Sequence, residues 1–106
     1  ISLFRTMVDA ISVSKLRRRL IDWNYEPLGM EEAFYMATAG GGGFFGKVGR
    51  FEKGYEFDAL VIDDSRYRAA RQMPPKERLE RFIYLAEGSG DIVEKYVLGR
   101  QVLDRR

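Results

Sequence analysis

Apolar residues near the start of the chain recur with the period of an α-helix. The spacing i, i+3, i+4, i+7, i+8 is typical of one buried helix face. The residues that follow and continue this spacing are Leu3, Phe4, Met7, Val8, Ile11, Leu16, Leu20 and Ile21. Ser2 can cap the N-terminus of such a helix, and Pro27 ends it because the residue before a proline favours extended geometry. We therefore predict a helix near residues 3–21 with this apolar face buried.

A second helix is predicted to begin near Gly29 or Met30, where Glu31 and Glu32 complement the helix dipole. Glycine costs about 1 kcal/mol relative to alanine inside a helix, so the glycine run at residues 40–43 is predicted to end it. The buried side of this helix would be formed by Ala33, Phe34, Met36 and Ala37.

From residue 48 onward the pattern favours strands. Gly49 and Gly54 are typical of tight turns, and the apolar run at residues 57–62 is typical of a strand covered on both faces. A polar, arginine-rich loop is predicted at residues 65–73.

One helix and two strands complete the predicted elements. The helix would cover residues 76–87, and Pro75 suits its first position. Alternating residues predict a strand at 92–98, and after a turn at 98–100 a short return strand at 101–103.

Composition restricts the chemistry of the chain more than its fold. The 106 residues allow one domain, and 45% hydrophobic with 32% charged residues favour a globular protein. The net charge of +2 does not indicate a nucleic-acid partner, and no apolar run reaches the ~20 residues that span a bilayer. The sequence contains no histidine and no cysteine, so imidazole and thiolate are missing as metal ligands and as catalytic groups.

The most tempting motif is the run GGGFFGK at residues 41–47, which satisfies the phosphate-loop pattern G-x-x-x-x-G-K. Val48 stands where a serine or threonine should hold magnesium, and the run follows a predicted helix rather than a strand. We favour a glycine-rich end of the helix followed by an apolar plug, Phe44 and Phe45. Nucleotide binding through Lys47 remains an alternative.

Three other groups of residues are candidates for chemistry or binding. Carboxylates could act as acid–base pairs or magnesium ligands, although helix capping and turn formation are the simpler roles; Asp58 is expected to be partly buried and to bond the turns at residues 49–54. Basic and tyrosine side chains could bind nucleic acid, although interleaved acids favour a mixed, solvated surface. Seven aromatic residues are predicted to be core material. The carboxylates are Glu31, Glu32, Asp58, Asp63 and Asp64. The basic and tyrosine residues are Arg17, Arg18, Arg19, Arg66, Arg68, Arg71, Arg105, Arg106, Tyr25, Tyr55 and Tyr67. The aromatic residues are Trp23, Phe34, Tyr35, Phe44, Phe45, Phe51 and Phe57.

Several segments together resemble the C-terminal end of the amidohydrolase superfamily and, more narrowly, the guanine deaminases. Residues 37–40 (ATAG) match an A-T-x-G segment, and residues 49–59 match G-x-F-x-x-G-x-x-F-D-A. Further matches lie at residues 14–17, 81–85 (RFIYL) and 93–99. The sequence departs from the family at residues 86–91, where a G-D-D-R-N loop is usual, and at Arg50, where a small polar residue is usual.

The resemblance implies an α/β fold class. Residues 1–47 would be the last helices of a (β/α)₈ barrel, and residues 48–106 would be part of its flanking β-sandwich with one helix at 76–87. It implies a cytoplasmic parent enzyme that uses zinc to convert guanine to xanthine and ammonia. The family's zinc ligands and purine pocket precede the matched region, so no catalytic, cofactor-binding or metal-binding residue is assigned here and the isolated chain is predicted inactive.

The apolar face of residues 3–21 would pack on the barrel in such a parent. Exposing each of its large side chains would cost roughly 1.5–3 kcal/mol, so the isolated chain is predicted either to self-associate through this face or to repack it internally. The alternative function is a stand-alone interaction module that uses residues 3–21 or Arg66, Arg68 and Arg71.

Overall fold

The computed structural model describes residues 2–67, 71–86, 88 and 90–106 of the chain. The chain mixes helices and strands, which agrees with the expected α/β class. The elements are α1 (Leu3–Leu20), α2 (Met30–Tyr35), a π-helical turn η1 (Met36–Gly40), β1 (Ala59–Ile62), a 3₁₀ turn η2 (Ser65–Tyr67), α3 (Pro75–Leu85), β2 (Ile92–Val97) and β3 (Arg100–Asp104).

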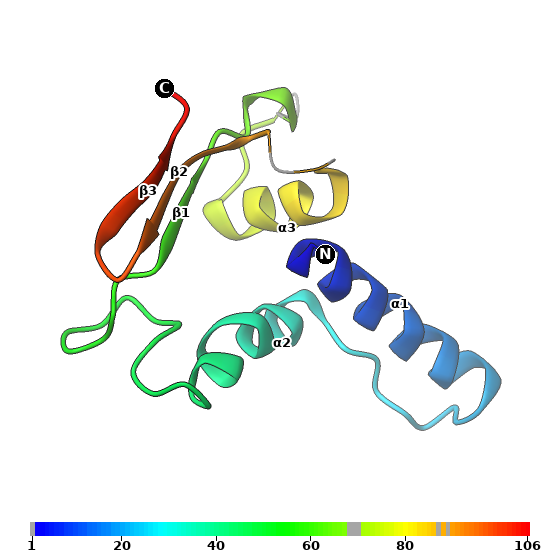
Figure 1. The fold of residues 1–106 in the computed structure, drawn as a ribbon. Coiled ribbons are helices and arrows are strands. Elements are labelled where there is room, and N and C mark those ends of the chain that lie inside the picture. Colours follow the sequence, from blue (N-terminus) through cyan, green and yellow to red (C-terminus); the bar gives the residue numbers. More distant parts are fainter. Residues whose placement is uncertain (1, 68–70, 87, 89) are drawn as a thin grey trace.

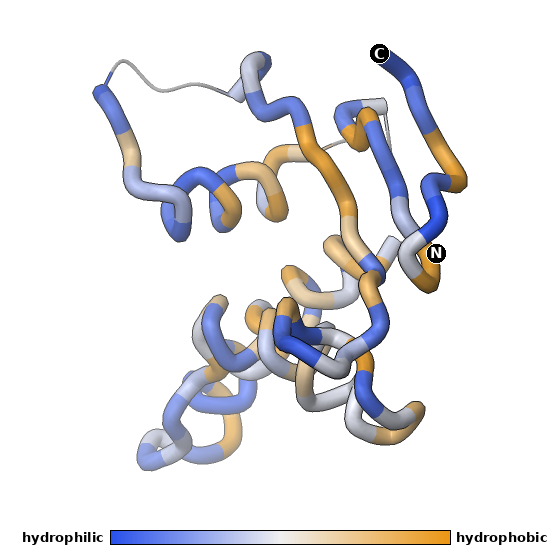
Figure 2. Tube along the Cα trace, turned by 90° about the vertical axis from the view of Figure 1, so that its left-hand side faces the viewer, coloured by the Kyte–Doolittle hydropathy of each residue, from blue (hydrophilic) through white to orange (hydrophobic). Residues whose placement is uncertain are grey.

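The three strands form one antiparallel sheet in the order β1-β2-β3. Figure 1 shows α1 and α2 below and to the right of this sheet, with α3 between the sheet and α1. In Figure 2 the strand β1 is a continuous hydrophobic stretch between α3 and the β2–β3 hairpin. The chain therefore has a helical part and a sheet part, which α3 connects.

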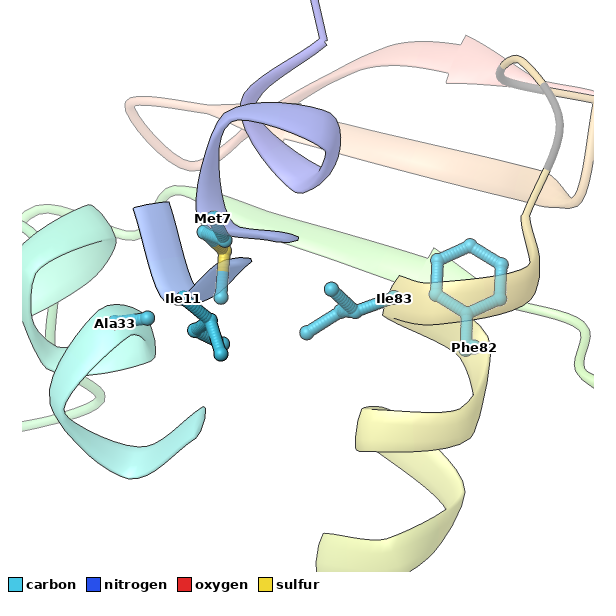
Figure 3. Close-up of a cluster of buried hydrophobic side chains, with 5 residues drawn as sticks. All are labelled: Met7, Ile11, Ala33, Phe82 and Ile83. Carbon is cyan, nitrogen blue, oxygen red and sulfur yellow. The ribbon is translucent and has the colours of Figure 1, made fainter. Parts of the chain in front are cut away.

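The core lies where the three α-helices meet (Figure 3). Phe82 is only 1% exposed. Its ring meets Phe4 edge-on with centroids 5.4 Å apart, and Tyr67 at 5.8 Å. The fully buried members of this cluster are Met7, Ile11, Ala33, Phe82 and Ile83.

The first helix is confirmed, but its apolar face is buried only in part. Ser2 caps it by accepting a hydrogen bond from the backbone N–H of Arg5 at 3.4 Å. Phe4, Met7, Val8 and Ile11 pack inside the chain. The exposed members of the predicted face, contrary to the prediction, are Leu3, Leu16, Leu20 and Ile21. The reason is that the second apolar group lies on a different side of the helix, which neither α2 nor α3 covers.

The connection after α1 is held by a buried hydroxyl group. Ser14 donates to the carbonyl of Ile11 at 2.7 Å and accepts from the backbone N–H of Leu28 at 2.9 Å. The hydroxyl thereby connects the backbone of α1 to Leu28, which lies fourteen residues after Ser14. The hydrophobic pattern did not predict this contact between Ser14 and Leu28.

The prediction that the second helix ends within glycines 40–43 is confirmed, because helical backbone continues to Gly42 and residues 43–45 form a turn. The chain continues from α2 through η1, and Gly41 keeps right-handed helical angles (φ −68°, ψ −37°). Close approach explains these glycines, because a Cβ on Gly41 would lie under 3.0 Å from the carbonyl oxygen of Met36, and one on Gly42 under 3.0 Å from that of Val48. The absence of a side chain lets a distant segment pack against the helix.

The three strands are confirmed; β1 and β2 are shorter than predicted, and β3 is longer by one residue at each end. β1 is not covered on both faces, since Leu60 is exposed and its neighbours are half-buried. The turn between β2 and β3 is confirmed: Leu98 (φ 51°) and Gly99 (φ 77°) both adopt positive φ, as a two-residue hairpin turn requires. Pro75 is the first residue of α3, as predicted. The predicted end of this helix at residue 87 lies outside the described residues.

The molecule is more open than a complete domain of its size. Its Cα radius of gyration is 15.7 Å, whereas a compact domain of this length has about 13 Å. It exposes 8261 Å², whereas a compact monomer of this mass exposes about 6,100 Å². The prediction that seven aromatic residues form the core is accordingly wrong for all seven. The exposed ones are Trp23, Phe34, Tyr35, Phe44, Phe45, Phe51 and Phe57.

Candidate functional site

Two of the candidate carboxylates stabilise the helices. Glu32 accepts a hydrogen bond from the backbone N–H of Gly29 at 3.1 Å and so caps α2. Glu31 forms an ion pair with Lys76 of α3. The predicted role at the helix N-terminus is thus confirmed for Glu32, while Glu31 connects two helices.

Asp58 is exposed, not partly buried, and it does not bond the turns at residues 49–54. Its Oδ1 atom instead accepts a hydrogen bond from the backbone N–H of Leu98 at 2.8 Å. The carboxylate therefore fixes the hairpin turn to the start of β1, and the sequence could not indicate a partner forty residues away.

Asp63 and Asp64 occupy the predicted turn after β1. Asp63 accepts from the backbone N–H of Ser65 at 3.0 Å, and this hydrogen bond lowers its pKa below the ordinary 3.8. Asp64 forms a bidentate ion pair with Arg78 of α3, in which each of the two hydrogen bonds measures 2.8 Å. Both carboxylates thus have structural partners.

An ion pair between Arg66 and the largely buried Asp91 connects η2 to the residue before β2. The side chain of Asp91, only 11% exposed, accepts hydrogen bonds from the hydroxyl of Tyr67 at 2.7 Å and from the guanidinium of Arg66 at 2.9 Å. The Tyr67 hydrogen bond, followed by that of Arg66, lowers the pKa of Asp91 below its ordinary value. Arg66, a candidate phosphate ligand, is therefore committed to an internal contact.

Other candidate arginines are also paired within the chain. Arg71 bonds Glu77 at 2.8 Å, and Arg106 lies 3.5 Å from Glu94. The guanidinium of Arg17 lies 4.5 Å from the centre of the Tyr25 ring. These contacts agree with the mixed, solvated surface favoured by the sequence. Arg68 lies outside the described residues.

The described residues do not form a metal site. No group of three or more histidine, cysteine, aspartate or glutamate side chains comes together among them. An open cleft of about 510 Å³ beside the sheet carries charges of both signs. Its lining residues are Ile62, Asp63, Asp64, Arg78, Val93, Arg105 and Arg106.

The glycine-rich run at residues 41–47 is not built as a phosphate loop. It follows a helix rather than a strand. The backbone N–H groups of Phe44 and Phe45 donate within the turn, to the carbonyls of Gly41 at 3.3 Å and Gly42 at 2.8 Å. Because these N–H groups have internal acceptors, they cannot converge on a phosphate as such a loop requires.

The most prominent feature of the surface is uncovered apolar area. On α1, Val13, Leu16 and Leu20 lie three and four residues apart and therefore share one side of the helix, and Leu20 is 75% exposed. Phe44 and Phe45 are 88% and 81% exposed. Contiguous apolar surface of this kind is typical of a binding interface. Within the described parts of the chain, no helix has the length and hydrophobicity needed to cross a membrane.

Comparisons with known proteins give this surface a context. No family model matches the chain. A crystal structure of guanine deaminase from C. acetobutylicum with bound guanine in the active site matches 96% of the chain at 47% identity, with a TM-score of 0.88. The chain is a guanine deaminase segment. The resemblance seen in the sequence is thereby confirmed.

Curated guanine deaminases match as well. The protein from Dictyostelium discoideum is 33% identical over 86 residues, and that from Homo sapiens is 34% identical over 91 residues. These matches cover 74% and 76% of the chain, respectively. The chain spans only 19–20% of these relatives and 24% of the solved guanine deaminase.

Proposed function

We propose that the chain is a scaffold segment of a guanine deaminase, an enzyme that hydrolyses guanine to xanthine and ammonia. The observation that carries this proposal is the similarity to the C. acetobutylicum guanine deaminase, which extends over 96% of the chain at 47% identity. A similarity of this extent supports the same place in a larger polypeptide. The parent would be a cytoplasmic hydrolase of purine metabolism.

The parent would use zinc, as the resemblance implies, but the residues of this chain do not fit a zinc site. Zinc in proteins takes histidine, cysteine and carboxylate ligands. The chain has neither histidine nor cysteine, and the carboxylates singled out above cap a helix, shape turns or pair with basic residues. The metal ligands and the purine pocket would therefore come from the remaining part of the polypeptide.

The role of the chain would be to support that remaining part. It exposes about 2,200 Å² more than a compact monomer of its mass, and obligate interfaces bury an area of this order. We propose that residues 1–47 are the last helices of the parent's (β/α)₈ barrel and that residues 48–106 belong to its flanking β-sandwich.

Helix α1 gives this arrangement a physical basis. Met7 and Ile11 are buried against α2 and α3, while Val13, Leu16 and Leu20 form a second apolar side. A helix that is apolar on two sides is typical of a middle layer. The second side would pack against the barrel.

A chimera tests the proposal. The 106 residues replace the matching segment of the C. acetobutylicum guanine deaminase, and loss of guanine is followed by absorbance. We expect guanine turnover by the chimera and none by the isolated chain or by the host without the segment. A folded but inactive chimera would overturn the scaffold role, and so would guanine turnover by the isolated chain.

A further inference from the structure

Phe44 and Phe45 are the most exposed large hydrophobic residues in the described part of the chain, at 88% and 81%. Their rings contact each other edge-to-face with centroids 5.1 Å apart, and neither residue belongs to the core cluster. In Figure 1 the segment that joins α2 to β1 runs along the lower left of the molecule, away from α1 and α3. The aromatic pair is therefore left uncovered by this chain.

The backbone around the pair is held by short-range contacts. Hydrogen bonds from the N–H groups of Phe44 and Phe45 close the turn, and the N–H of Glu56 donates to the carbonyl of Lys47 at 2.8 Å on the return path. A Cβ on Gly49 would lie under 3.0 Å from the carbonyl oxygen of Thr38, so the loop that contains Gly49 packs directly against the π-helical turn η1. The backbone that carries the two rings is thus held in one arrangement.

An aromatic pair on a fixed backbone has the properties of an interface anchor. Aromatic side chains dominate binding energy when they fill a pocket, and a fixed conformation lowers the entropy lost on binding. An exposed residue without a role would have neither a second aromatic ring in contact with it nor close glycine–backbone contacts in the adjoining segments.

We propose that Phe44 and Phe45 anchor this segment by inserting together into an apolar pocket of the remaining guanine deaminase polypeptide. This inference rests on the proposed function. The relatives contain about four times as many residues as this chain spans, and that part can supply the pocket. A second copy is a poorer occupant, because the three clefts described on this chain, of about 160, 310 and 510 Å³, each include charged side chains in their lining.

The test compares the chimera with the isolated chain. In both, Phe44 and Phe45 are replaced together by serine, and in a matched control together by leucine. We expect the serine pair to lower the thermal midpoint of the chimera by about 5–10 °C and the leucine pair to lower it by less than half as much. The midpoint of the isolated chain should not change with either pair.

Each outcome bears on a different claim. An unchanged midpoint for the serine chimera would overturn the anchor while leaving the proposed function intact. An equal loss in the isolated chain would also overturn it, because the rings would then stabilise this segment itself. Failure of the unmodified chimera to fold or to turn over guanine would overturn the proposed function, and the anchor would lose its partner with it.

Discussion

Replacing Phe82 by alanine tests whether the three-helix cluster is the core of the chain. Phe82 is 1% exposed and meets the rings of Phe4 and Tyr67. Truncating a buried phenylalanine to alanine typically costs 3–5 kcal/mol through lost burial and a residual cavity. A chain of this length has about 5–15 kcal/mol of stability, and its large exposed surface places it at the lower end. Phe82→Ala should therefore leave only about 0–2 kcal/mol of stability, so that up to about half of the isolated chain is unfolded at room temperature.

The assay is urea and thermal unfolding followed by circular dichroism. Phe44→Ala is the matched control, because it makes the same chemical change at a side chain that is 88% exposed, where the effect should stay within about 0.5 kcal/mol. Ile83→Val, a smaller truncation in the same cluster, should cost about 0.5–1.5 kcal/mol. Similar losses for Phe82→Ala and Phe44→Ala would show that the cluster is not the core.

Three further predictions concern other contacts. Ser14→Ala should destabilise the chain by about 1–3 kcal/mol, because it leaves the buried N–H of Leu28 without its acceptor; a urea midpoint equal to that of the original chain would contradict this. Asp91 has a lowered pKa, so its contribution to stability is complete above the unfolded value near 3.8 and is lost as the pH falls through the lower folded value; unfolding measured from pH 6 to 2 should show a weaker acid loss for Asp91→Asn, and identical profiles would refute the assignment. Leu16→Arg should lower the thermal midpoint of the chimera but not that of the isolated chain, because Leu16 is exposed in the isolated chain; equal effects on the chimera and the isolated chain would exclude the outer side of α1 as an interface.

Local chemistry predicted several elements correctly. The Ser2 cap, Pro75 at the first position of α3 and the Leu98–Gly99 turn each depend on one or two residues. Preferences of this kind are visible in the sequence because they need no distant partner. The partners of Asp58 and Ser14 were not predictable, since they lie forty and fourteen residues away.

Burial was predicted less well, for a physical reason. Apolar pattern indicates which side chains avoid water, but it does not say which molecule covers them. Phe44 and Phe45 were predicted to be core material because they are large and aromatic, yet they are 88% and 81% exposed. The close contacts of Gly42 and Gly49 were not predictable for a related reason: both glycines meet backbone that comes from outside their own element.

The three-helix core brings together residues from both ends of the chain. Its members extend from Met7 to Ile83, so α1 can pack on α2 early but its core is complete only after α3 has been synthesised. Contacts with such large sequence separation slow folding, since a long loop must close before they form. A nascent or truncated chain that lacks α3 should therefore leave Met7 and Ile11 open to proteases and chaperones, however well its first helix forms.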